Sequence, residues 1–280
     1  STGNAQDFGD LRSQTADGAR ECGSSSGETY GAYFGGYKGS SGGTTDEIEY
    51  ITIASTGNTG DFGDFLTNRY YNYSGVGNGI RGLCCGGFGQ YGNIDNITYI
   101  TVASLGNAAD AGDCTVAMSE TAGNANTTRG IWWVSRTASY FQQKNADYVA
   151  IATTNDAADF GDYSVLIRAP AAIGLSESRN VWAGGRSEDS GGAYITNIEY
   201  INPASLDDTE EFGDLAAGAS HMGGGKLGNG ARGEIWGGEL NNSGLNSEVI
   251  QYITIANTGD STDAGNLDVV RSHWDGWSGD

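Results

Sequence analysis

Short runs that alternate apolar and polar residues recur along the chain, separated by stretches rich in glycine and asparagine. Two of the clearest runs are E-I-E-Y-I-T-I-A at 47–54 and N-I-T-Y-I-T-V-A at 96–103. Alternation of this kind, with many β-branched residues, is typical of a half-buried strand. No stretch shows the sustained apolar spacing of an amphipathic helix. The pattern therefore predicts an all-β chain.

The runs belong to a repeated phrase, Y-I-T-I-A-S-T-G-N-x-x-D-F-G-D-L, whose D-F-G-D end or a close variant of it occurs six times. The central glycines are spaced by 54, 49, 49, 52 and 52 residues: Gly9, Gly63, Gly112, Gly161, Gly213 and Gly265. A period of about 50 residues indicates an array of supersecondary units. We expect one domain over 1–280, with approximate units at 1–54, 55–103, 104–152, 153–204 and 205–256 and a partial unit at 257–280.

Each unit is expected to hold four short strands, called a, b, c and d here. In the fifth unit they are placed at 221–229, 233–238, 249–256 and, after the D-F-G-D turn, 266–271. Double glycines end strand b: Gly35, Gly36, Gly86, Gly87, Gly184, Gly185, Gly237 and Gly238. The repeated aromatic residues of the turn are Phe8, Phe62, Phe160 and Phe212. Four strands in about 50 residues are the pattern of a propeller blade.

The double glycine, the tyrosine on strand c and the polar turns resemble kelch repeats. The phrase is similar to a degenerate kelch-like repeat of marine bacteriophages, including cyanophages, where it occurs in virion and tail-associated proteins. The resemblance covers nearly the whole chain and implies a kelch-like β-propeller. It departs from ordinary kelch units, which carry a tryptophan soon after the tyrosine. Here the aromatic residue comes later, as from Tyr50 to Phe62, and is alanine at Ala111 and Ala264.

The number of blades is open from the sequence. Strands b and c occur five times, whereas the D-F-G-D turn occurs six times and a sixth strand a is expected at 273–280. Five complete blades with a partial sixth repeat, which we favour, and a six-bladed ring without one b–c hairpin both fit. The chain begins in a turn at Ser1 without a methionine, so we expect a piece of a longer polypeptide or a processed product.

The strongly acidic composition limits the partners. The net charge is −21 and the pI is about 4.2, so binding to nucleic acid or to an anionic membrane surface is not expected. No apolar run approaches the roughly 18 residues of a membrane span, so membrane insertion is not expected either. Together with the resemblance, this composition favours a virion surface or extracellular location.

The four cysteines, Cys22, Cys84, Cys85 and Cys114, do not recur with the repeat and have no C-x-x-C spacing. Neighbouring residues of a strand point to opposite faces, which is expected for Cys84 and Cys85. We expect free buried thiols, with a Cys22–Cys84 or Cys22–Cys85 bridge as the alternative.

Catalytic chemistry has little support. The chain has two histidines, His221 and His273, at the start of strand a in consecutive units, and we interpret them as surface or loop residues. No catalytic residue and no cofactor are expected. The turns could offer Ca²⁺ oxygen ligands at Asn58, Asp61 and Asp64, but we favour the interpretation that these oxygens satisfy local backbone donors.

The repeated arginine at the start of strand b is expected to have a structural role between units, pairing with the repeated aspartates. Its copies are Arg81, Arg129, Arg179 and Arg232.

Ligand binding is predicted from topology. In a four-stranded antiparallel unit, the b–c and d–a loops share one face, and this face collects residues that differ between units. These candidates for ligand binding are Tyr37, Lys38, Arg69, Tyr70, Tyr71, Tyr73, Phe88, Tyr91, Arg136, Tyr140, Phe141, Arg186, Tyr194 and Trp274. Tyrosine, tryptophan and arginine suit sugars and protein surfaces.

We therefore expect a non-enzymatic virion structural or attachment protein that binds a host surface glycan, a neighbouring virion protein or copies of itself. One alternative is a purely structural fibre or decoration module without a ligand. A carbohydrate-active enzyme is a further alternative, and it has the least support from the residues.

Overall fold

The structure is a computed structural model that describes residues 8–12, 23–37, 43–69, 75–137, 143–173, 176–226, 231–240, 245–270, 272–273 and 276–277. It is all-β, as predicted, and no helix occurs in these ranges. Accordingly, none of the described residues belongs to a helix with the length and hydrophobicity needed to cross a bilayer. Strand pairs are antiparallel except for β22 (Gly223–Lys226) with β26 (Gly276–Trp277), which are parallel.

Four strands paired in chain order recur through the molecule. The first two sets are β1 (Gly23–Ser26), β2 (Tyr30–Tyr37), β3 (Thr44–Thr52) and β4 (Gly60–Arg69), then β5 (Gly75–Gly77), β6 (Arg81–Cys85), β8 (Gly92–Thr101) and β9 (Ala109–Ser119). The next two are β10 (Ala122–Ala125), β11 (Arg129–Trp133), β13 (Asn145–Ala150) and β14 (Ala158–Asp162), then β16 (Ala171–Ile173), β17 (Asn180–Ala183), β20 (Asn197–Ile201) and β21 (Glu210–Asp214). The fifth is β22, β23 (Arg232–Trp236), β24 (Val249–Thr254) and β25 (Thr262–Asn266).

Several two-residue strands sit on the connections between these elements. They are β7 (Phe88–Gly89), β12 (Arg136–Thr137), β15 (Ile167–Arg168), β18 (Arg186–Ser187) and β19 (Ala193–Tyr194). Strand β12 pairs with the end of β9, while β15, β18 and β19 form a small sheet of their own.

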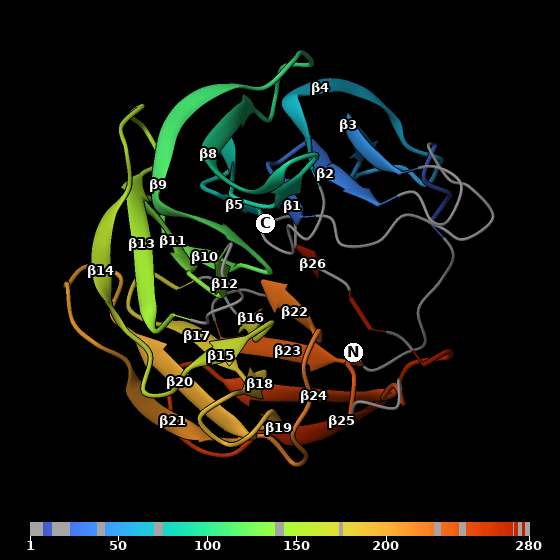
Figure 1. The fold of residues 1–280 in the computed structure, drawn as a ribbon. Coiled ribbons are helices and arrows are strands. Elements are labelled where there is room, and N and C mark those ends of the chain that lie inside the picture. Colours follow the sequence, from blue (N-terminus) through green and yellow to red (C-terminus); the bar gives the residue numbers. More distant parts are fainter. Residues whose placement is uncertain are drawn as a thin grey trace.

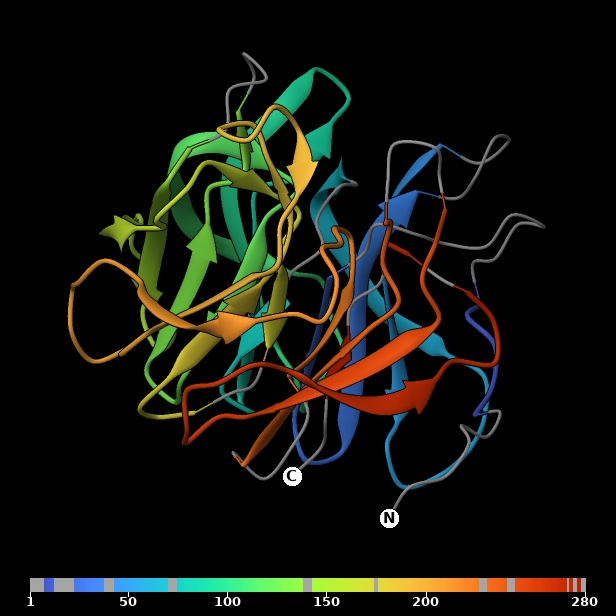
Figure 2. The ribbon, with the colours of Figure 1, turned by 90° about the horizontal axis from the view of Figure 1, so that it is seen from below.

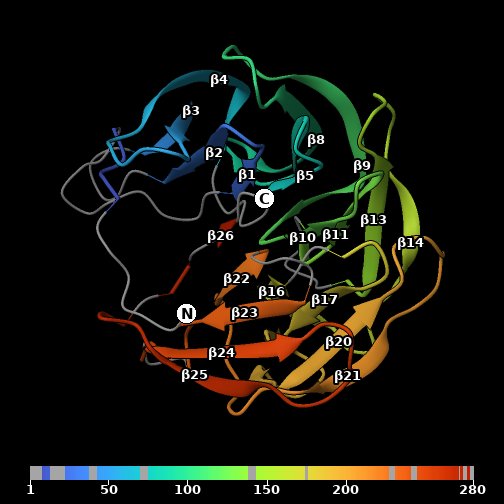
Figure 3. The same ribbon diagram turned by 180° about the vertical axis from the view of Figure 1, so that it is seen from behind.

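The five main sheets follow one another around a common centre (Figures 1 and 3). Their first strands lie innermost: β1 contacts β5, β5 contacts β10, β10 contacts β16, and β16 contacts β22. Strand β26 lies beside β22 and also contacts β1. The last strands lie outside, and β9 is strongly curled (Figure 1). Figure 2, seen from below, shows the orange-red strands of the fifth sheet nearest the viewer.

The hydrophobic core is divided into clusters between successive sheets, and the described clusters join neighbouring sheets in pairs. Between the third and fourth sheets, for example, the buried rings of Trp133 and Trp182 meet with centroids 5.1 Å apart. The second, third and fourth sheets thus each present one face to the previous unit and one to the next, so a single unit cannot bury its own core.

The position of D-F-G-D differs from our prediction. In the five later copies these residues lie inside the outer strands, not in a turn before them, whereas the described part of the first copy, Phe8 to Asp10, lies outside any strand. Strand β25 covers Thr262–Asn266 instead of the predicted 266–271. On β4, Gly63 pairs with Ile48 and Asp61 with Glu49, which leaves Phe62 as the extra residue of a bulge. The bulge places the ring of Phe62 against Tyr50, with the centroids 6.3 Å apart.

The double glycines do end strand b in the second, fourth and fifth sheets, and they adopt positive φ. In the first sheet the prediction is wrong, because β2 continues through Gly35 and Gly36 to Tyr37, with a shift of register after Phe34. At Gly237 and Gly238, φ is 66° and 99°, a conformation that disfavours side chains and turns the chain away from the sheet.

The repeated arginine has the expected role between units, but its partners differ from those we predicted. The Arg81 guanidinium lies 4.4 Å from the centre of the Tyr99 ring, and its Nη1 donates to the carbonyl oxygen of Ile151 in the next unit at 3.2 Å. Arg129 and Arg179 repeat both contacts. An aromatic ring and a backbone carbonyl take the place that we had assigned to aspartates.

The cysteine prediction is wrong for two of the four residues. Cys85 and Cys114 form a disulfide between β6 and β9, with Cα atoms 6.8 Å apart. Both belong to the cluster between the second and third sheets, whereas Cys84 belongs to the cluster on the other side. The predicted opposite orientation of Cys84 and Cys85 is therefore confirmed, and it is what turns Cys85 toward Cys114. Cys22 lies outside the described residues.

Candidate functional site

In four successive units, the same backbone position holds a non-glycine residue in the left-handed region. Glu120, Ala169, His221 and His273 have φ of 56°, 48°, 52° and 67°, and no other described non-glycine residue has positive φ. Each lies eight residues after a central glycine: 112 to 120, 161 to 169, 213 to 221 and 265 to 273. Such a conformation costs on the order of 1 kcal/mol or more and is found most often at functional sites.

Backbone hydrogen bonds connect this position from one unit to the next. The His221 N–H donates to the carbonyl oxygen of Ala169 at 3.0 Å, and the His273 N–H donates to that of His221 at 2.8 Å. The side chains at this position are therefore held close to one another by the scaffold itself.

The residue after the double glycine, or after its equivalent, is a second repeated position. It pairs with the residue that precedes the left-handed position. Ser220, which precedes His221, exchanges both backbone hydrogen bonds with Glu239, at 2.8 and 3.0 Å. Arg136 pairs in the same way with the residue before Glu120, and Arg186 with the residue before Ala169. These short ladders bring the chemically variable residues of three units to one place.

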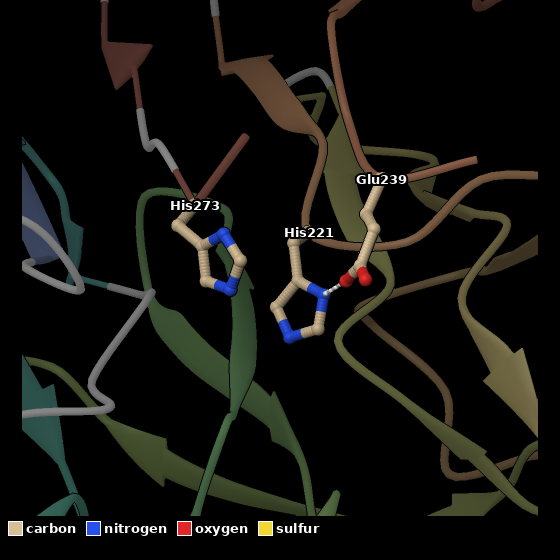
Figure 4. A group of neighbouring side chains, drawn as sticks. All are labelled: His221, Glu239 and His273. Carbon is tan, nitrogen blue, oxygen red and sulfur yellow. Dashed lines mark ion pairs between the residues drawn. The ribbon is translucent and has the colours of Figure 1, made fainter. Parts of the chain in front are cut away.

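The two histidines and Glu239 form the centre of the site (Figure 4). The imidazole rings stack with centroids 4.1 Å apart and planes at 19°. Nδ1 of His221 lies 3.4 Å from Oε2 of Glu239. Ser220 Oγ lies 2.9 Å from Nδ1 of His221, and Ser272 Oγ lies 2.9 Å from Nδ1 of His273.

Burial lowers the pKa of His221 well below its usual value, and His273, Arg168 and Arg186 lower it further. The ring is therefore neutral at pH 7 and keeps a nitrogen lone pair. A neutral imidazole can accept a hydrogen bond or ligate a metal ion.

Three guanidinium groups surround this centre. Arg136 Nη1 lies 2.8 Å from Oε1 of the buried Glu120, and Arg168 Nη1 lies 3.9 Å from Oε2 of the same carboxylate. Oε2 of Glu120 and Nε of Arg168 are buried and have no hydrogen-bond partner among the described residues. Arg168 and Arg186 are also the cations whose charges lower the pKa of His221, so the arginines and the histidine belong to one connected group of side chains.

Tyr194 extends the site from β19, where it pairs with Arg186 of β18. Burial raises the pKa of the Tyr194 hydroxyl, as do the charge of Glu239 and a hydrogen bond with it. The phenol therefore stays protonated at neutral pH and can donate a hydrogen bond.

The predicted binding residues fall into several groups. Arg136, Arg186 and Tyr194 converge on this site. Tyr37 and Phe88 are half-buried and occupy the repeated position after the double glycine in the first two units, and Tyr91 is exposed on the β7–β8 turn. The others lie outside the described residues, Arg69 excepted: Lys38, Tyr70, Tyr71, Tyr73, Tyr140, Phe141 and Trp274.

Arg69 is enclosed, which the sequence did not lead us to expect. Its side chain is 0% exposed, lies 4.7 Å from the centre of the Phe65 ring and donates to the carbonyl oxygen of Gly86 at 3.1 Å and to Oδ1 of Asn96 at 3.1 Å. A large ligand has no access to a guanidinium in that position.

The sequence did not single out Glu120, Arg168 or Glu239, and we interpreted the two histidines, at the start of strand a in consecutive units, as surface or loop residues. Both histidines do lie between strands, but they are stacked, and the side chain of His221 is only 9% exposed. Alignment of the units on their central glycines was the available signal, because it places His221 and His273 at the same repeat position as Glu120.

The turn considered for Ca²⁺ has other partners. Asn58 Oδ1 accepts the N–H of Asp10 at 3.0 Å, and Asp61 pairs with Arg12 at 3.1 Å. In the part of the chain that the structure describes, the one group of histidine, cysteine and carboxylate side chains close enough to share a metal ion is His221, Glu239 and His273.

Comparison with protein-family models finds no match, and no curated protein matches the chain. The function is therefore inferred from the geometry of the site.

Proposed function

We propose that the chain is a kelch-like β-propeller that serves as a non-enzymatic attachment module on a virion, and that the site described above binds an acidic sugar of a host surface polysaccharide. The ring of contacts from β1 through β5, β10, β16, β22 and β26 back to β1 supports the propeller. The position of β26 supports a partial sixth unit beside five complete ones.

The observation that carries the ligand class is the gathering of Arg136, Arg168 and Arg186 in a chain of net charge −21. With His221 neutral, these three cations face Glu120, Glu239 and Glu188, and the contact of Glu188 with Arg186 is long, at 4.0 Å, and partly exposed. A guanidinium that is paired so loosely suits a ligand carboxylate, because guanidinium groups bind carboxylates through paired hydrogen bonds.

Polar and aromatic groups beside the arginines suit the rest of a sugar. Tyr194 offers a phenol hydroxyl and an apolar ring face, and the half-buried His273 offers a further ring. No nucleophile–base pair is needed for binding of this kind, so the proposed role is recognition without turnover.

The test is a glycan array that compares acidic polysaccharides with neutral ones of similar backbone, at two salt concentrations. We expect retention of acidic glycans that weakens as salt rises. Arg186→Ala should reduce the affinity about tenfold or more, since it removes a charge-assisted contact. Arg12→Ala, which removes a cation paired with Asp61 outside the site, is the matched control and should bind normally.

Equal binding by wild type and Arg186→Ala would overturn the assignment of the site. Absence of glycan binding together with concentration-dependent assembly would favour the purely structural module. Loss of reducing ends from any polysaccharide during incubation would favour an enzyme.

A further inference from the structure

We propose that His221, Glu239 and His273 form a binding site for Zn²⁺ or a chemically similar divalent transition-metal ion. The ligand atoms of the three side chains lie within 4.8 Å of one another. They come from two consecutive units and meet through the backbone bond from His273 N–H to His221 O.

The distances are close to those of a bound ion. In tetrahedral zinc sites the metal–ligand bonds are about 2.0–2.1 Å, which places neighbouring ligand atoms about 3.4 Å apart. His221 Nδ1 and Glu239 Oε2 are already 3.4 Å apart. The ligand atoms of the whole set lie within 4.8 Å of one another, so binding of one ion requires the His273 ring to turn out of its stack toward the other two ligands.

Neighbouring serine side chains and backbone hydrogen bonds support both histidines. Ser220 and Ser272 each place a hydroxyl 2.9 Å from Nδ1 of the histidine that follows. When Nε2 ligates the ion, Nδ1 keeps its proton and donates it to the hydroxyl, which holds the ring; when Nδ1 ligates the ion, its lone pair goes to the metal and the serine contact is released. The left-handed backbone at both histidines is held by hydrogen bonds between units, so the backbone from which both rings project is fixed in advance.

The donor set selects the kind of ion. Two imidazoles and one carboxylate suit zinc, cobalt or nickel better than calcium or magnesium, which prefer oxygen ligands alone. Three protein ligands leave at least one coordination position for water or a ligand oxygen. The metal site does not depend on the glycan proposal, because it can be tested with the metal ion alone.

The experiment is a titration of the purified, EDTA-treated chain with Zn²⁺ by calorimetry and with Co²⁺ by absorption. We expect one ion per chain with micromolar or tighter affinity, and Co²⁺ bands of the intensity typical of four-coordinate sites. His221→Asn and His273→Asn should each weaken binding at least tenfold. Asparagine is chosen because it tolerates the left-handed backbone at these positions.

Two controls separate this site from general attraction to an acidic protein. Asp61→Asn removes an exposed carboxylate elsewhere and should leave the metal affinity unchanged. Thermal melts in EDTA should show that both histidine variants are folded; if one is not, Glu239→Gln replaces it in the comparison. Binding that is non-saturable, or that survives in the double variant His221→Asn/His273→Asn, would overturn the proposal.

Discussion

The backbone N–H of Gly106 donates to the backbone carbonyl oxygen of Phe62 at 2.7 Å, and this bond joins two successive units. Beside it, the N–H of Asp64 donates to Oδ1 of Asn107 at 3.1 Å. The T-G-N turn of one unit thus binds the D-F-G-D bulge of the unit before it. The same contact recurs at Gly57 with Phe8 and at Gly259 with Phe212. The phrase that made the repeat visible in the sequence is the one that connects the units.

Gly63→Ala should destabilise the protein by about 2 kcal/mol or more, since a Cβ on Gly63 would lie 2.4 Å from the carbonyl oxygen of Gly106. The φ of Gly63, +148°, is also unfavourable for a side chain. Gly265→Ala is the matched control, because φ is +126° there but no atom of the described residues lies within 4 Å of the added Cβ. It should cost about 1 kcal/mol, from the backbone alone. Equal losses in urea unfolding would argue against the contact.

Arg81 and Tyr99 should be energetically coupled by about 1 kcal/mol, because the guanidinium lies over the ring at 4.4 Å and is partly shielded from water. A double-mutant cycle with Arg81→Ala and Tyr99→Leu measures the coupling as a difference in free energy of unfolding. The same arginine paired with Tyr91→Leu is the control, since Tyr91 is 95% exposed. Coupling of similar size in both cycles would show that the ring contact is not its source.

The sequence predicts the inner elements of each unit well and the outer strand poorly. Alternation around Tyr99 and the double glycine after Cys85 identify strands b and c from local signals alone. The glycine of D-F-G-D suggests a turn for the same physical reason that it forms a bulge, namely positive φ. Only the pairing of Gly63 with Ile48 on the neighbouring strand distinguishes a bulge from a turn, and strand pairing cannot be read from the local sequence.

The candidate site was predicted in part, since topology alone placed Arg136, Arg186 and Tyr194 on one face. Glu239 and the two histidines were not placed in the site by the sequence. They come together through the pairing of Ser220 with Glu239 and through the backbone hydrogen bond between the histidines. The repeat period relates the two histidines to each other, but no sequence spacing places Glu239 beside them, because it comes from a different segment of the chain. Physical proximity of His221 and Glu239 therefore became visible only in three dimensions.

The disulfide is predicted to be present in the purified protein and to stabilise it. It links residues that are 29 positions apart, and the loss of chain entropy in the unfolded state gives a stabilisation of about 3.6 kcal/mol for a loop of this length. Peptide mapping without reductant should show Cys85 linked to Cys114, and Cys114→Ser should lower the urea midpoint. Cys84→Ser, on the opposite face of β6, should leave the linkage intact. Alkylation of Cys85 in the unfolded, unreduced protein would contradict the assignment.

Asp147→Asn should make the protein equally or more stable at pH 7. Burial raises the pKa of Asp147, and the hydrogen bonds from the Thr115 hydroxyl and N–H only partly oppose this. The native state therefore holds the proton more tightly than the unfolded state, whose pKa is about 3.9. The stabilisation that protonation gives is present below that pH and is lost as the pH rises through the native pKa. Asparagine keeps an oxygen for Thr115 without the charge.

The fold accommodates a neutral acceptor at this position, because Gln251 occupies it in the fifth sheet and accepts the N–H of Ala216 at 3.0 Å, while Glu49 and Glu199 occupy it in the first and fourth sheets. The check is urea unfolding of wild type and Asp147→Asn from pH 4 to pH 7, where the advantage of the variant should grow with pH. Asp268→Asn, an exposed change of the same charge, accounts for the general relief of negative charge. A deficit of the Asp147 variant that increases toward pH 7 would mean that the ionised carboxylate stabilises the fold, because its bonds to Thr115 would then outweigh the cost of burial.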